Sequence, residues 1–172
     1  MTMHDEFESG FSLTELIVAV AIVGILGTVA LPQYFHQLQK TRQNEAATTL
    51  SQIQTTIAAF VDEMGILPVS WSDLNKITPL MTPDGPANQE NFGWITLASA
   101  SCTKAKSEHC YEVRVIETDK LFISTARSRH QDARNYNVVA CLDLTNGASD
   151  LKKGTDSTPV HKKNLSCQRS EG

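Results

Sequence analysis

One carboxylate stands alone in the first part of the chain. Glu15 lies near the start of an apolar stretch, residues 10–31, and no formal charge follows it from residue 16 to residue 35. A charged side chain at bilayer depth costs on the order of 2.5–3.5 kcal/mol on insertion scales, and such residues usually serve a function. Glu15 therefore needs a cationic partner, but residues 1–39 contain no Lys or Arg.

A cut between Gly10 and Phe11 would supply that cation. The cut creates an α-amino group, which is mostly protonated below about pH 8. Phe11 and Glu15 stand one helical turn apart, so the amino group of one copy can pair with the carboxylate of a neighbouring copy. The spacing thus favours a chemistry of assembly, in which cleavage is followed by ion pairing between copies.

The four cysteines all follow the apolar stretch. An even number of cysteines in one domain favours disulfides where that domain lies in an oxidising compartment. Four cysteines allow three pairings, and the sequence does not choose among them. We favour Cys102–Cys110, which closes a short loop, and Cys141–Cys167, which would fasten the polar tail.

A compact basic cluster lies further along the chain. Arg127, Arg129 and Arg134 gather around His130, and the tail adds Lys152, Lys153, Lys162 and Lys163. Such clusters can contact phosphates with a salt-sensitive affinity, so the three arginines are candidate DNA contacts. The alternative is an ordinary solvated surface, which is the commoner meaning of a charge cluster.

The sequence offers no sign of catalysis or of a cofactor. It contains no phosphate-binding glycine loop, no nucleophile elbow, no H-E-x-x-H and no C-x-x-C pair. His109 beside Cys110 does not have the spacing of a zinc site. We therefore expect a protein that is not an enzyme and binds neither metal nor cofactor.

The apolar stretch that carries Glu15 is long enough to cross a membrane. Its uncharged part, residues 16–35, holds twenty residues, which span roughly 30 Å as a helix. A plain anchor, or a signal peptide cut near residues 28–30, would also be apolar. A signal peptide has a basic start and no acid, however, and a buried core helix is seldom apolar on every side.

A second pattern begins beyond Pro32. From residue 33 to Met64 apolar residues recur every three or four positions, which predicts an amphipathic helix that Gly65 and Pro68 end. Gly24, Gly27 and Pro32 weaken the helix upstream. We expect either a soft point there that can bend, or a simple kink with small residues for close packing.

Strand patterns occupy the rest of the chain. We expect strands over residues 94–100, 111–117, 121–127 and 136–144, with the second and third forming a hairpin and the last one central. Residues 70–77 predict a short helix, and the tail from residue 145 has the composition of turns. The fold class expected is α+β, with about four antiparallel strands packed on the amphipathic half of the long helix.

The order of residues around Glu15 has a known counterpart. Residues 10–17, G-F-S-L-T-E-L-I, ahead of an apolar run and Pro32, resemble the N-terminal signature of type IV pilins and their relatives. In that family a prepilin peptidase cuts after the glycine and methylates the new N-terminus. The subunits then pack into a filament through their apolar helices.

The resemblance, which covers roughly residues 9–40, implies roles for individual positions. Gly10 is the residue before the cut, Phe11 the methylated terminus and Glu15 the assembly acid, while Pro32 matches the helix-breaking proline. The implied domains are a leader, 1–10; a helix, 11–64, with an apolar half, 11–35, and an amphipathic half, 36–64; and an extracytoplasmic α+β domain, 65–172.

The leader departs from the family pattern, which is usually basic. It carries Asp5, Glu6 and Glu8, and the first basic residues, Lys40 and Arg42, lie beyond the span. A count of positive charges would place the leader outside the cytoplasm. The resemblance implies the opposite: a single-pass inner-membrane precursor with its C-terminal domain outside, which later joins a pilus on the cell surface.

Charge fits self-assembly better than nucleic-acid binding. The 172 residues carry a formal charge of −4, of which the leader contributes −3, so residues 11–172 carry −1. Copies of a near-neutral subunit repel one another little. The predicted function is a structural pilus subunit that binds further copies, other pilins, the prepilin peptidase and the inner-membrane assembly machinery. The alternatives are a minor pilin for DNA uptake or adhesion, and a pseudopilin of a type II secretion system.

Overall fold

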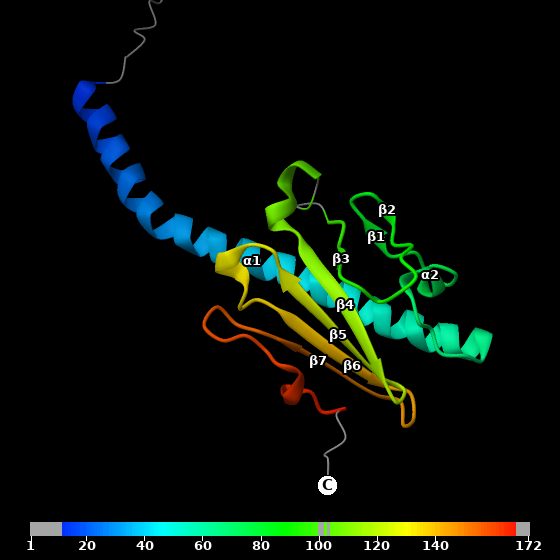
Figure 1. Cartoon of the computed structure of the whole chain (residues 1–172). Helices are drawn as coiled ribbons and strands as arrows, with labels where there is room; N and C mark the ends of the chain where they lie inside the picture. The colour runs from blue at the N-terminus through cyan, green and yellow to red at the C-terminus, as the bar shows by residue number, and fades with distance from the viewer. Residues whose placement is uncertain (1–11, 100–101, 103, 168–172) are drawn as a thin grey trace, which may run out of the picture. The chain divides into compact units, whose positions relative to one another are not determined.

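The computed structural model describes residues 12–99, 102 and 104–167. A long helix, α1 (Leu13–Met64), and a sheet of antiparallel strands in the order β3-β4-β5-β6-β7 dominate it (Figure 1). The chain divides into two compact units, Met1–Leu38 and Gln39–Gly172. The predicted α+β class, with a long helix packed on an antiparallel sheet, is confirmed.

The remaining elements are short apart from the strands of the main sheet. The sheet contains β3 (Ile95–Thr96), β4 (Tyr111–Thr118), β5 (Leu121–Ser128), β6 (Val138–Asp143) and β7 (Ala148–Lys153). Between α1 and the sheet lie α2 (Trp71–Leu74) and a small hairpin of β1 (Met81–Thr82) and β2 (Gly85–Pro86). Three 3₁₀ turns are η1 (Lys104–His109), η2 (Gln131–Ala133) and η3 (Lys162–Asn164).

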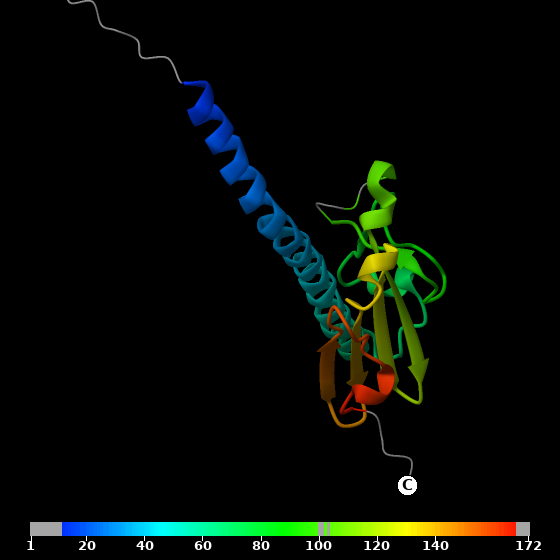
Figure 2. The same cartoon turned by 90° about the vertical axis from the view of Figure 1, so that its left-hand side faces the viewer.

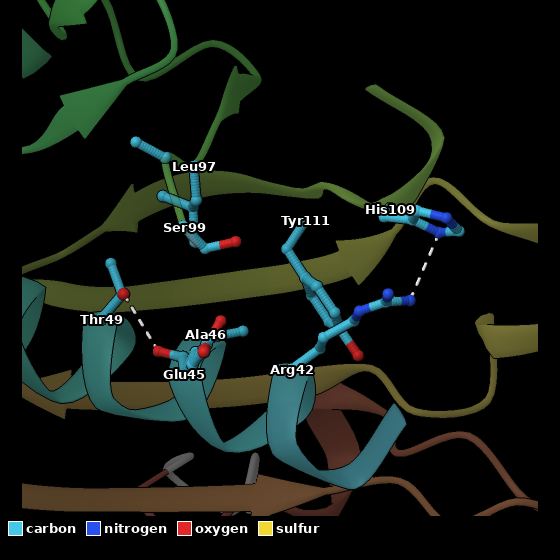
Figure 3. Close-up of a pocket in the computed structure, with 9 residues that line it drawn as sticks. Arg42, Glu45, Ala46, Thr49, Leu97, Ser99, His109 and Tyr111 are labelled. Carbon is cyan, nitrogen blue, oxygen red and sulfur yellow. Dashed lines mark hydrogen bonds between the residues drawn. The ribbon is translucent and has the colours of Figure 1, made fainter. Parts of the chain in front are cut away.

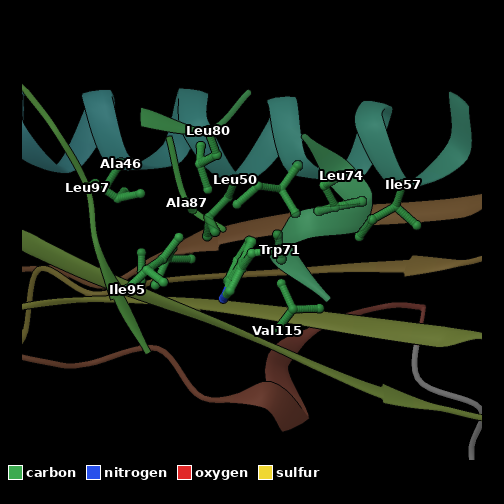
Figure 4. Packing of buried hydrophobic residues seen from close by; sticks show 14 of the residues in the cluster. Ala46, Leu50, Ile57, Trp71, Leu74, Leu80, Ala87, Ile95, Leu97 and Val115 are labelled. Atoms are coloured by element: carbon green, nitrogen blue, oxygen red, sulfur yellow. The ribbon is translucent and has the colours of Figure 1, made fainter. Parts of the chain in front are cut away.

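The second half of α1 buries its apolar stripe against the sheet. Leu50 and Ile57 are fully buried, and they belong to one core with Trp71 and Val115 (Figure 4). Burying each such side chain contributes about 1.5–3 kcal/mol. Met64 departs from the predicted stripe: it is 46% exposed, because the helix ends there.

The main sheet differs from the expected one in three places. The strand predicted over residues 94–100 is confined to Ile95–Thr96, and β7 adds a strand where the sequence predicted only turns. The strand predicted over residues 136–144 is limited to β6, Val138–Asp143, which is an interior strand between β5 and β7. The predicted hairpin is present as β4 and β5, each one residue longer than expected.

The C-terminal segment, residues 160–167, packs on the face of the sheet that points away from α1 (Figures 1 and 2). Val139 and Cys141 face this segment, whereas their neighbours Val138 and Ala140 belong to the core under α1, since successive strand residues point to opposite faces. We call the face away from α1 the outer face. A second, smaller apolar cluster therefore covers its β6 side.

Candidate functional site

Glu15 takes part in the cap that begins α1. Its Oε2 accepts a hydrogen bond from the backbone N–H of Ser12 at 2.9 Å, and its own N–H donates to Ser12 Oγ at 3.4 Å. These reciprocal bonds form a capping box, in which a hydroxyl and an acid three residues later satisfy donors at a helix start. The S-x-x-E spacing is typical of such a cap, so Glu15 has a local structural role beside the predicted role in assembly.

The helix after Glu15 exposes its apolar side chains. Leu13 is 75% exposed, and Val23 and Ile25 are each 69% exposed. The helix contains a window with a mean hydropathy of 2.3, no part of it buried, which suffices by length and composition to cross a membrane. Such a surface needs lipid or other protein around it.

The residues of the predicted cleavage site, Gly10 and Phe11, lie outside the described residues. The predicted soft point is described: α1 continues through Pro32, and a Cβ added at Gly24 or Gly27 would meet nothing within 4 Å. Both glycines leave room for a neighbouring backbone, which suits close helix packing. Bending at this segment stays a prediction.

Both disulfides that we favoured are present. Cys102 pairs with Cys110, with Cα atoms 4.8 Å apart, and Cys141 pairs with Cys167, with Cα atoms 6.2 Å apart. The second bond joins β6 to the C-terminal segment at the outer face. Each of the four cysteines is buried, so the bonds act as structural links.

The three arginines predicted as DNA contacts meet on the outer face of the sheet. Arg127, Arg129 and Arg134 line one open hollow with Trp94 and Glu112. Its lining also includes Thr125, Ser128 and Asn137. We call this the outer-face hollow. It joins residues from β4, β5, the segment before β3 and the segment between β5 and β6.

Two of the three guanidinium groups in the hollow, those of Arg127 and Arg129, are held in place. Glu112 Oε2 accepts hydrogen bonds from Arg127 at 3.2 and 3.0 Å, and Glu112 Oε1 lies 3.7 Å from Arg129 Nε. The Arg127 guanidinium also lies 3.9 Å from the centre of the Trp94 ring, a cation–π arrangement. No local pattern in the sequence predicts the contributions of Trp94 and Glu112, because they become neighbours of the arginines only through strand pairing.

A smaller cavity lies between α1 and β4 (Figure 3). Arg42 Nη1 lies 3.3 Å from His109 Nδ1 at its edge, and Tyr111 donates a hydrogen bond from its hydroxyl to the carbonyl of Tyr136 at 2.8 Å. Burial raises the pKa of Tyr111 well above its usual range. The cavity measures about 20 Å³, which is room for about one water molecule. It is a feature of packing.

No group of three or more His, Cys, Asp or Glu side chains that could hold a metal ion occurs within the described part of the chain.

Comparison with known proteins identifies the N-terminal segment. Residues 7–31 match the family model described as the prokaryotic N-terminal methylation motif. The chain is 32% identical over 73 residues to the type IV major fimbrial protein FimA of Dichelobacter nodosus, a match that covers 41% of this chain and 47% of that protein. No solved structure matches the chain.

Two further relatives have different functions from each other. The chain is 28% identical to the type IV major alpha-pilin of Moraxella bovis, over 58% of this chain and 54% of the relative. It is 25% identical to the type II secretion system core protein G of Vibrio cholerae, over 51% of this chain and 60% of the relative. The chain thus spans about half the length of the curated relatives that it matches.

Proposed function

We propose that this chain, whose N-terminal segment carries the signature of the type IV pilin family, is a structural subunit of a surface filament. The relatives include major pilins and a secretion-system core protein. One observation carries the proposal. The methylation motif coincides with a helix whose apolar side chains are exposed and whose first turn holds one acid, Glu15.

Glu15 supports assembly through its remaining acceptor sites. In the described chain one of its oxygens accepts the N–H of Ser12. A carboxylate has about four acceptor positions, so Glu15 can also bind an amino group of a neighbouring copy. Cleavage after Gly10 would place a charged amine on Phe11, next to Ser12. Charge-assisted pairing at low dielectric is strong, which would set the axial position of each copy against the next.

The apolar surface allows the helices to bundle but does not by itself drive bundling. Lipid tails are as apolar as the side chains of Leu13 or Val23, so moving the helix from lipid to a helix bundle gains little hydrophobic energy. Close packing and the Glu15 ion pair must then favour the bundle. The open flanks of Gly24 and Gly27 support such packing.

The proposed route begins in the inner membrane. The precursor would cross it once through the apolar half of α1, with residues 65–172 outside, where both disulfides can form. A prepilin peptidase would remove residues 1–10 and methylate Phe11. Assembly machinery in the inner membrane would then move the subunit into a filament with copies of itself and other pilins.

Two substitutions test this proposal. Gly10→Val should leave uncut precursor in the membrane, because the peptidase must fit a small residue before the cut. Glu15→Gln should leave membrane insertion intact but lower the amount in sheared filaments about tenfold or more, since the loss of a desolvated ion pair has a large effect. Glu63→Gln, on the exposed end of the same helix, is the matched control.

The N-terminal residue of the mature protein tests whether the chain is cut after Gly10. Mass spectrometry of filament protein should return a chain that begins with methylated Phe11. A mature chain that starts at Met1, or Glu15→Gln filaments at wild-type yield, would contradict the proposal. Abundance in sheared filaments separates a major subunit from a minor pilin, and presence only in a secretion apparatus would indicate a pseudopilin.

A further inference from the structure

We propose that the outer-face hollow receives the β4–β5 turn of a second copy of this chain. The inference rests on the proposed assembly into filaments and names the contact between the folded units. It identifies an interaction surface at each end of one hairpin.

The hollow carries a net positive charge. Arg127, Arg129 and Arg134 contribute three cations against the single carboxylate of Glu112. Arg127 and Arg129 share Glu112, whereas Arg134 is exposed and makes no ion pair among the described residues. Arg134 is therefore the guanidinium best placed to take a carboxylate from outside, and a guanidinium can bind a carboxylate with two parallel hydrogen bonds.

The hollow is also organised before any partner arrives. Arg127 is fixed between Glu112 and the ring of Trp94, and the guanidinium of Arg114 lies 5.0 Å from the centre of the same ring. Side chains that are already ordered lose little entropy when they bind. This distinguishes the hollow from a solvated row of flexible charges.

The β4–β5 turn has the complementary charge. Glu117 and Asp119 are exposed, and neither makes an ion pair within the described part of the chain. Asp119 and Lys120 have φ of 50° and 68°, which closes a tight two-residue turn. Glu117 Oε1 accepts the N–H of Lys120 at 3.1 Å, which orders its carboxylate at the tip. The charge of Lys120 offsets one of the two acids.

The positions of the two surfaces suit a chain of subunits. Tyr111 pairs with Ser128 at the end of the hairpin near the hollow, and Thr118 pairs with Leu121 at the turn. Eight residues of strand separate the ends by roughly 25 Å. A contact between different surfaces of identical copies does not close on itself unless a ring forms, so it can repeat along a filament.

Nucleic acid fits the hollow less well, although these arginines were predicted as DNA contacts. Glu112 lies between Arg127 and Arg129 and would repel a phosphate. A carboxylate turn needs one or two guanidinium groups, whereas firm DNA binding neutralises many phosphates. DNA binding is accordingly the competing outcome of the test.

Zero-length crosslinking tests the contact directly. The full chain in detergent, with Arg134→Lys, presents an amine that carbodiimide can couple to an adjacent carboxylate. We expect peptides that join position 134 to Glu117 or Asp119. In a mixture of ¹⁴N- and ¹⁵N-labelled chains these peptides should carry both labels, which shows that two copies are joined. Arg134→Gln cannot couple and is the control. Coupling at position 134 only within one copy, or only to other carboxylates, overturns the proposal.

Charge reversal tests the same contact in filaments. Arg134→Glu and Glu117→Arg should each lower the amount of chain in sheared filaments about fivefold, the scale of one exposed ion pair. The double variant should restore most of it, whereas Lys163→Glu, outside the hollow, should change nothing. Single variants at wild-type level, or a double variant without recovery, contradict the inference.

The two proposals fail in different ways. Absence of the wild-type chain from filaments would contradict the proposed function, while the crosslink in detergent still decides the contact. Wild-type filaments that tolerate Arg134→Glu would contradict the contact alone. Binding of a 30-base-pair DNA duplex that Arg134→Gln weakens, without the crosslink to Glu117 or Asp119, would assign the hollow to DNA.

Discussion

At the scale of single residues, two glutamines join α1 to the sheet. Gln43 Nε2 donates hydrogen bonds to the carbonyls of Gly154 at 2.8 Å and Asn137 at 3.2 Å. Gln54 Nε2 donates to the carbonyls of Cys141 at 2.7 Å and Asp150 at 3.3 Å. Each amide thus bridges backbone on either side of the β6–β7 pair, which fixes the sideways position of the helix.

Replacing Gln43 should be costly. The side chain is only 5% exposed, so Gln43→Ala would leave the Gly154 carbonyl without its donor at a buried site and the Asn137 carbonyl with the N–H of Gly154 alone. We expect a loss of about 1–3 kcal/mol in the free energy of unfolding. Denaturant titration in detergent, followed through the fluorescence of buried Trp71, measures it. Gln52→Ala, on the exposed side of the helix, should change the value by less than about 0.5 kcal/mol, and equal effects would contradict this role.

Asp150 should make the folded unit sensitive to acid. The backbone N–H of Ser166, at 2.9 Å, is the main cause that holds the pKa of this carboxyl below its usual value. A group whose pKa is lower in the folded state stabilises at pH above its unfolded pKa, and this contribution is lost as the pH falls through the folded pKa. The free energy of unfolding should therefore fall below about pH 4, and Asp150→Asn should reduce that slope. An unchanged slope in the variant would contradict the assignment.

The sequence predicts single residues when their partners are close in the chain. Glu15 stands out because its apolar neighbours leave it without a cation. Loop length and the need to fasten a tail favoured the disulfide pairs that form, although the sequence alone allowed three pairings. No local sequence pattern predicts the role of Trp94. Its neighbours, Arg114 and Arg127, come from β4 and β5, and only the strand register brings them to its ring.

At the scale of elements, the helix and the hairpin are encoded locally. Gly65 adopts φ of 69°, and its N–H bonds to Val61 at 2.9 Å, which ends α1 where the sequence predicts. The β4–β5 hairpin follows from alternating burial along both strands. These signals lie within a few residues of the structure that they specify, so no tertiary information is needed.

Strand β7 shows where local signals fail. Its sequence, ASDLKK, contains one large apolar residue, Leu151, and resembles the polar tail around it. It forms because β6 offers a free edge and pairs with it over six residues. Edge strands commonly carry Lys and other polar residues, since these discourage pairing between molecules. The formation of β7 is therefore determined by its pairing with β6 rather than by its own sequence.

The two disulfides should contribute unequally to stability. Cys141–Cys167 closes a span of 26 residues and Cys102–Cys110 a span of 8. Loop-closure entropy gives about 3.5 kcal/mol for the longer span and about 2.5 kcal/mol for the shorter. Paired Cys→Ser variants at each bond, unfolded in denaturant, measure both values. A larger loss for the Cys102–Cys110 pair would show that native contacts, rather than the entropy of the unfolded chain, set the order.

At the scale of the whole molecule, the chain combines two kinds of surface. The unit Met1–Leu38 exposes large apolar side chains wherever it is described, whereas the unit Gln39–Gly172 encloses its own core. The first requires lipid or further copies around it. The second buries helix, sheet and loops together, and every member of its main core lies at Ala46 or beyond. Assembly and folding are thus assigned to different parts of the sequence.

This division predicts that residues 39–172 fold without the rest. Exported alone to an oxidising compartment, they should give a water-soluble product with both disulfides and no free thiol, because the core needs nothing from residues 1–38. The full chain should need detergent, since its apolar helix is exposed. Size-exclusion chromatography, thiol titration and thermal unfolding check each point. Because the core is unchanged, residues 39–172 should unfold cooperatively, with a Tm within about 5 °C of the Tm of the full chain in detergent. A product that aggregates, or that unfolds without cooperativity, would show that the first unit contributes to the fold as well as to assembly.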